Sequence, residues 1–126
     1  MTEAAKQRPL LLVIEDDEDI REGLAALLGV KGYAVVAAAQ GLEALERLAG
    51  GLAPLVILLD VRMPVMDAAG FLEKKNADPS LAPIPVLLLT GADDDAGKAA
   101  ALGVSGVVRK PIDIEGLLSA IGRFRR

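Results

Sequence analysis

The chain has 126 residues, 52% of them hydrophobic, and a formal net charge of −4 at pH 7. This length suits a single globular domain with its own core. The sequence contains no histidine and no cysteine, which excludes Ser-His-Asp and Cys-His catalysis, ordinary zinc sites and disulfides. Any chemistry must therefore rest on carboxylates, lysine, hydroxyl groups and a hard metal ion.

The sequence indicates neither a membrane segment nor a secretion signal. No apolar run reaches the roughly 18 residues that would span a bilayer. Residues 1–9 lack the apolar stretch of a signal peptide. We therefore expect a cytoplasmic protein without a membrane partner, with residues 1–9 as an N-terminal extension and residues 10–126 as the folded domain.

Apolar runs without polar alternation predict strands that are buried on both faces of a parallel sheet. We expect strands over 10–14, 33–39, 55–60, 85–89 and 107–109. We expect a first helix from Ile20 that ends at Gly32, and further helices over 41–48, 68–77, 96–102 and 114–124. Five β/α units without an internal repeat predict an α/β fold, a single doubly wound, five-stranded parallel sheet. Right-handed crossovers then place helices on both faces of the sheet.

Two helices carry more specific expectations. Asp17 and Asp19 suit the N-terminal turn of the first helix, where the helix dipole favours carboxylates. In the helix over 41–48, we place Leu42, Leu45 and Leu48 on the inner face.

Polar side chains follow the strands that are expected to be central. Glu15 and Asp16 come after the first strand, Asp60 ends the third, Thr90 follows the fourth and Lys110 the last. In open α/β sheets, ligands bind at the carboxyl edge of the strands. Each residue alone has an ordinary explanation, since an aspartate such as Asp60 also favours the start of a turn. Four strands that deliver suitable side chains to one edge favour a functional site.

These residue types indicate phosphoryl chemistry. Three crowded carboxylates repel one another, so at least one pKa should rise unless a cation lies among them. Mg²⁺ fits, because it binds carboxylates and leaves room for phosphate oxygens. Lys110 and Thr90 could hold those oxygens, and Asp60 is best placed to act as a nucleophile that forms an acyl phosphate.

The motifs carry a resemblance to a known family. Residues 12–16 read Leu-Val-Ile-Glu-Asp and are followed by Ile20-Arg21, residues 60–67 read Asp-Val-Arg-Met-Pro-Val-Met-Asp, and Thr90 and Lys110-Pro111 complete the set. Over its whole length, the chain resembles the receiver domain of two-component response regulators. The resemblance implies strand order 2-1-3-4-5, as in flavodoxin, and a receiver domain over residues 10–126.

The resemblance also implies a site and partners. Asp60 would accept a phosphoryl group from the phosphohistidine of a sensor histidine kinase or a phosphotransfer protein, and a downstream protein effector would read the result. Asp16, Asp60 and the backbone carbonyl of Arg62 would bind Mg²⁺ directly, and Glu15 through water. Thr90 and Lys110 would complete the phosphorylation site, and the Lys110-Pro111 peptide bond is expected to be cis. Such a protein is a stoichiometric phosphoacceptor rather than an enzyme.

Several positions depart from the family pattern. Ala68 replaces the usual glycine and would be strained if its φ were positive. Gly91 replaces a frequent alanine, and Val107 replaces the aromatic residue that moves with Thr90 on activation. The stretch from Thr90 to Lys110 is about two residues short. These departures keep open an alternative, a degenerate receiver that binds proteins without phosphorylation.

Other functions fit less well. A phosphatase of the haloacid-dehalogenase type needs a second acid where Arg62 stands, a flavodoxin needs a Ser/Thr/Gly-rich phosphate loop after the first strand, and a dinucleotide fold needs Gly-x-Gly-x-x-Gly there. Direct nucleic-acid binding is not expected either, because the basic cluster of Arg123, Arg125 and Arg126 is small and the chain is acidic.

Overall fold

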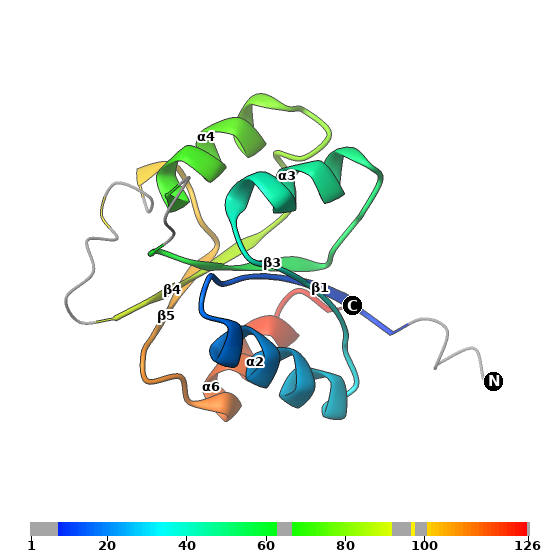
Figure 1. Cartoon of the computed structure of the whole chain (residues 1–126), viewed down its shortest axis with the longest axis vertical. Coiled ribbons are helices and arrows are strands. Elements are labelled where there is room, and N and C mark those ends of the chain that lie inside the picture. The colour runs from blue at the N-terminus through cyan, green and yellow to red at the C-terminus, as the bar shows by residue number, and fades with distance from the viewer. Residues whose placement is uncertain (1–7, 63–66, 92–96, 98–100, 126) are drawn as a thin grey trace.

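The computed structural model describes residues 8–62, 67–91, 97 and 101–125. Within them lies a five-stranded sheet with the order β2-β1-β3-β4-β5, in which every pair of neighbouring strands is parallel (Figure 1). The strands are β1 (Leu10–Ile14), β2 (Ala34–Ala38), β3 (Val56–Asp60), β4 (Val86–Thr90) and β5 (Gly106–Arg109). The helices are α2 (Glu18–Val30), α3 (Gly41–Ala49), α4 (Ala68–Ala77) and α6 (Ile114–Gly122). The predicted fold class and strand order are confirmed, while most of the helix expected over 96–102 lies outside the described residues.

Helices cover both faces of the sheet. In Figure 1, α3 and α4 lie on one side of the strands, and α2 and α6 lie on the other. The core on the side of α3 and α4 includes Leu12, Ile14, Ile57, Leu59, Phe71, Leu72 and Leu88. The core on the side of α2 and α6 includes Leu11, Val13, Leu24, Leu28, Leu58, Leu87, Leu117 and Ile121. Successive residues of a strand point to opposite faces, so each central strand contributes side chains to both cores.

Strands β1, β3 and β4 form the buried centre of the sheet. All five residues of β3 and of β4 are buried, as are four of the five in β1. Ile14 pairs with Leu59, and the next residue of β3, Asp60, pairs with Leu89. The carboxyl ends of the three strands are therefore aligned, which brings the residues that follow them to one edge.

Aspartates cap three of the helices. Asp17, Asp67 and Asp113 are the N-cap residues of α2, α4 and α6, and each accepts a hydrogen bond from the third backbone N–H of its helix, at 3.0, 2.8 and 3.3 Å. Each cap satisfies a donor that the helix itself leaves without a partner. The predicted place of Asp17 at the start of α2 is confirmed.

One expectation about side chains is wrong, and the condition for strain at Ala68 is not met. Leu42 is 49% exposed and does not lie on the inner face of α3, where Gly41, Ala44 and Leu48 are buried. Ala68 is the first residue of α4, and in the described part of the chain no residue other than glycine has a positive φ. Alanine is thus unstrained at this position.

No helix within the described ranges is both long and apolar enough to cross a bilayer.

Candidate functional site

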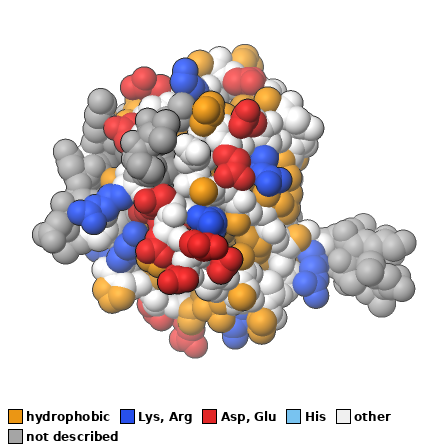
Figure 2. Space-filling view, in the orientation of Figure 1, with side chains coloured by type: hydrophobic (Ala, Val, Ile, Leu, Met, Phe, Trp, Pro, Cys, Tyr) orange, Lys and Arg blue, Asp and Glu red, His pale blue; other side chains and the backbone are white. Residues whose placement is uncertain are grey.

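The residues predicted for the site meet at the carboxyl edge of the sheet. Asp60 ends β3, Thr90 ends β4, and Glu15 and Lys110 directly follow β1 and β5. Glu15, Asp60 and Thr90 are each at most 3% exposed. Figure 2 shows acidic side chains gathered near the middle of this face, where α2 begins in Figure 1. The predicted convergence of these strand ends is therefore present in the structure.

Lys110 joins the two buried carboxylates. Its Nζ lies 3.0 Å from Oδ1 of Asp60 and 3.8 Å from Oε1 of Glu15. The backbone N–H of Lys110 donates to the carbonyl oxygen of Thr90 at 2.8 Å, and the Lys110-Pro111 peptide bond is cis, as expected. The ammonium thus stands at the centre of the site, and its side chain remains 27% exposed.

Glu15 has a strongly perturbed acidity. Its Oε2 accepts a hydrogen bond from the backbone N–H of Asp17 at 3.2 Å, whereas its buried Oε1 has no hydrogen-bond partner. The pKa of Glu15 is raised from 4.5 to about 8, chiefly by burial and next by the neighbouring Asp60, while the Asp17 N–H and Lys110 oppose the rise. A carboxylate pKa in the site is raised, as predicted, but burial contributes more to the rise than crowding does.

The site has the donors that a hard divalent cation requires. Glu15, Asp16 and Asp60 each offer a carboxylate oxygen, and these three oxygens lie within 4.8 Å of one another. When all three carboxylates are ionised, they and the Lys110 ammonium leave two negative charges, which a divalent ion would balance. The buried Oε1 of Glu15 lacks a hydrogen bond, and all the donors are oxygens, the ligand type that Mg²⁺ prefers. The residues therefore fit a Mg²⁺ ion.

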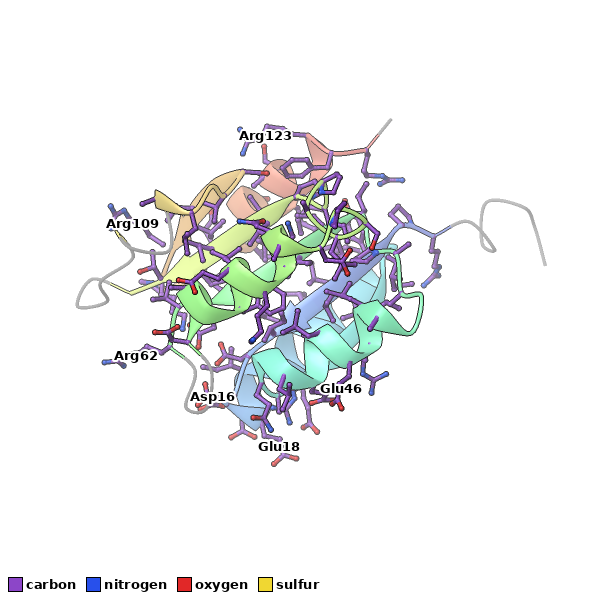
Figure 3. The ribbon with its side chains drawn as sticks, turned by 90° about the horizontal axis from the view of Figure 1, so that it is seen from above. Asp16, Glu18, Glu46, Arg62, Arg109 and Arg123 are labelled. Atoms are coloured by element: carbon purple, nitrogen blue, oxygen red, sulfur yellow. The ribbon has the colours of Figure 1, made fainter. Side chains whose placement is uncertain are left out.

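Two further predicted residues lie at the same edge. The hydroxyl of Thr90 donates to the carbonyl oxygen of Gly91 at 3.3 Å, and Thr90 follows the residue of β4 that pairs with Asp60. Arg62 is exposed two residues after Asp60, and its side chain points outward in Figure 3. Any contribution of Arg62 to cation binding would therefore come from its backbone carbonyl.

One departure from the family pattern lies on β5, three residues before Lys110. Val107 is 46% exposed on β5, where the family usually has an aromatic residue. Residues 92–96 and 98–100 of the shortened stretch between Thr90 and Lys110 lie outside the described residues.

One contact to the acid pair was not anticipated from the sequence. Nη1 of Arg21 donates to the backbone carbonyl oxygens of Glu15 at 3.0 Å and of Asp16 at 3.3 Å. The only sequence signal was an arginine one turn into the helix that follows the acid pair. Arg21 is therefore hydrogen-bonded to the backbone of two of the predicted cation ligands.

Comparison with known proteins decides the family, because the model of the response regulator receiver domain matches residues 11–122. The chain belongs to the response regulator receiver family. Receiver domains are modules of two-component signalling and not classical enzymes.

Relatives show the same assignment. The chain is 33% identical over 118 residues to the response regulator MprA of Mycobacterium sp. (strain KMS), which covers 92% of this chain and 50% of that protein. It is 34% identical over 116 residues to the hybrid signal transduction histidine kinase D of Dictyostelium discoideum, covering 90% of this chain and 7% of that protein. The chain thus spans about half the length of the response regulator and a small part of the kinase.

Solved structures agree with the fold. A putative response regulator from Chloroflexus aurantiacus J-10-fl has a TM-score of 0.86 at 27% identity, covering 94% of this chain and 98% of that one. The receiver domain of the sensor histidine kinase PA1611 from Pseudomonas aeruginosa PAO1, solved with a magnesium ion coordinated in the active-site cleft, has a TM-score of 0.85 at 25% identity, covering 93% and 97%.

Proposed function

We propose that this receiver accepts a phosphoryl group on Asp60 from the phosphohistidine of a sensor histidine kinase or a phosphotransfer protein, and that phosphorylation changes a surface that binds a downstream protein. The observation that carries the proposal is the buried Asp60 carboxylate with the Lys110 ammonium 3.0 Å from its Oδ1. An acid whose only purpose was to end a strand would not need a cation and two further carboxylates beside it.

In the reaction, a carboxylate oxygen of Asp60 attacks the phosphorus of the donor phosphohistidine. The new O–P bond forms an acyl phosphate, the N–P bond breaks, and the imidazole leaves with the electron pair of that bond. The donor imidazole must come from another protein, because this chain contains no histidine.

Lys110 and Thr90 serve the transferred group. The ammonium of Lys110 already contacts Asp60 and would pair with an oxygen of the incoming phosphoryl group. The hydroxyl of Thr90, which now donates to its neighbour's carbonyl at 3.3 Å, would turn to donate to a phosphoryl oxygen. Because the phosphorylated side chain would carry about 1.5 to 2 negative charges in place of the single charge of the carboxylate, both side chains would be drawn toward Asp60, which would bias the adjoining surface.

The acid pair would complete the site with a metal ion. Asp16, Asp60 and the backbone carbonyl of Arg62 would bind Mg²⁺ directly, and Glu15 would act through water. When bound, Mg²⁺ supplies positive charge to the phosphoryl oxygens as their negative charge develops.

A protein donor is supported by the surface of α2, which begins two residues after Asp16. Ile20, Leu27 and Val30 lie on one side of this helix and are 41%, 40% and 82% exposed. This apolar stripe suits contact with the donor. We expect Leu27→Glu to slow phosphoryl transfer from a kinase and to leave phosphorylation by acetyl phosphate unchanged.

The direct test is phosphorylation of the purified protein with acetyl phosphate and Mg²⁺. We expect a phosphate that is stable in acid and labile in base, present in the wild type and in the control variant Asp19→Asn and absent in Asp60→Asn. A wild-type protein that remains unmodified, or a phosphate that persists in Asp60→Asn, would refute the proposal.

A second candidate function is a degenerate receiver that binds its partner without phosphorylation. The exposed Val107, in place of the usual aromatic residue, favours this alternative. Measured affinity of a partner protein separates the two functions. Equal affinity for wild type, Asp60→Asn and Asp60→Glu would favour the degenerate receiver.

A further inference from the structure

Arg21 closes a ring of hydrogen bonds around the acid pair. The backbone N–H of Asp17 donates to Oε2 of Glu15 at 3.2 Å, and the side chain of Asp17 caps α2. From the first turn of α2, Arg21 returns to the acid pair and donates to the backbone carbonyls of Glu15 and Asp16, at 3.0 and 3.3 Å. The backbone N–H of Arg21 itself donates to the carbonyl of Asp17 at 2.9 Å. The junction between β1 and α2 is thus held by both main-chain and side-chain bonds.

The two carbonyls bound by Arg21 belong to the successive peptide groups that flank Asp16. On the sheet side, the N–H of Glu15 is fixed by the carbonyl of Ala38 at 3.1 Å. The side chain of Asp16, by contrast, is exposed. Its direction therefore depends on the orientation of the peptide groups that Arg21 holds.

The positive charge of Arg21 opposes cation binding, whereas its hydrogen bonds to the backbone of the acid pair favour it. A cation beside a metal site opposes the binding of a second cation. Arg21 is partly buried, and among the described residues its side chain donates to the two carbonyls rather than to a carboxylate. The positive charge of Arg21 would weaken cation binding unless the hydrogen bonds of its guanidinium favour binding by more than the repulsion opposes it.

The geometry points to Arg21 as a positioning residue that binds the Glu15 and Asp16 carbonyls and thereby holds the acid pair in the arrangement that binds Mg²⁺. This inference rests on the proposed function, which supplies the metal ion. Arg21 does not contact the phosphoryl group or the ion. It acts through the backbone of two ligands.

Three variants separate position from charge. Arg21→Lys keeps the charge but replaces the planar guanidinium by a single ammonium group. Arg21→Met removes both the charge and the donors while keeping an apolar stem, and Arg21→Gln provides a second neutral variant if Arg21→Met does not fold. Lys31→Met, at the C-terminal end of the same helix, is the matched control for the loss of one positive charge.

The first measurement is the dissociation constant for Mg²⁺ of each folded, metal-free protein, by isothermal titration calorimetry. We expect Arg21→Lys and the neutral variants to bind about tenfold to a hundredfold more weakly than the wild type, the range found when groups that orient metal ligands are lost. Lys31→Met should bind like the wild type. If Arg21→Lys equals the wild type and Arg21→Met binds more tightly, then Arg21 acts by charge alone and the inference is overturned.

The second measurement needs no metal. We expect the amide of Asp17, which donates to Glu15, to exchange its hydrogen faster in all three Arg21 variants, while core amides such as that of Leu58 keep the wild-type rate. Unchanged exchange at Asp17 would also overturn the inference. If the wild type binds no Mg²⁺, the metal in the proposed function is wrong, and hydrogen exchange still decides the role of Arg21.

Discussion

Glu15 should make the stability of the metal-free protein fall as the pH rises. Its pKa is raised from 4.5 in the unfolded chain to about 8 in the folded protein, chiefly by burial and then by Asp60. Between these two values, the folded protein holds a proton that the unfolded chain has released. Because the folded state binds more protons, the free energy of unfolding decreases with pH across this window.

The expected loss is large for a domain of this size. A pKa difference of this size corresponds to about 5 kcal/mol in total, and about 3 kcal/mol of it falls between about pH 5.5 and pH 8.5. The chain has no histidine or cysteine, so no side chain with an ordinary pKa near neutrality obscures the effect. Glu15→Gln keeps the shape of the side chain and removes its titration.

The assay is urea unfolding in EDTA, followed by far-UV circular dichroism at several pH values. We expect the wild type to lose stability with rising pH relative to Glu15→Gln, and excess Mg²⁺ to reverse this trend by favouring ionised carboxylates. Parallel pH profiles of the two proteins without metal would show that Glu15 is not protonated in the folded state.

Three other predictions use the same stability measurements. Mg²⁺ at about ten times its dissociation constant should stabilise the wild type by about 1.4 kcal/mol and leave the melting temperature of Asp60→Asn nearly unchanged; an equal shift in both proteins would exclude Asp60 as a ligand. Asp17→Ala should cost about 1 kcal/mol through loss of the cap on α2, whereas Asp19→Ala should cost less; equal losses would contradict the capping role. Burial lowers the pKa of Lys75, which is 2% exposed, so the folded state binds fewer protons than the unfolded chain. Wild type should therefore gain stability relative to Lys75→Met as the pH rises toward the ordinary lysine pKa of 10.5, and a constant difference would contradict a lowered pKa of Lys75.

The sequence predicts the strands well because burial on both faces leaves a continuous apolar run. The predicted bounds of β1 match the structure, and those of β3 and β4 differ by one residue. The short helix α3 shows the limit of this reasoning. Residues three apart on a helix are rotated by about 60° relative to each other, so Leu42 lies far around the helix from Leu48 and is exposed. Apolar identity alone did not reveal which of these leucines faces the core.

Some features of the site could likewise be predicted from the sequence, and others could not. Residues at strand ends could be placed from the sequence, because parallel strands deliver their carboxyl ends to one edge. The contacts of Arg21 could not, since they depend on how α2 turns back toward the loop before it. The direction of the Glu15 pKa shift was predictable from crowding, but the dominance of burial required the structure.

The alternation of side chains between the two cores limits how this chain can vary in length. In β3, Leu58 packs on the side of α2 and α6, and Leu59 on the side of α3 and α4. One residue added within this strand would exchange these two side chains between the layers and would displace Asp60 by about 3.3 Å along the strand, away from Lys110. Insertions and deletions should therefore be tolerated in the connections between elements and should disrupt the protein inside the central strands. The five-residue length of β3 thus sets the distance between the Asp60 carboxylate and the Lys110 ammonium.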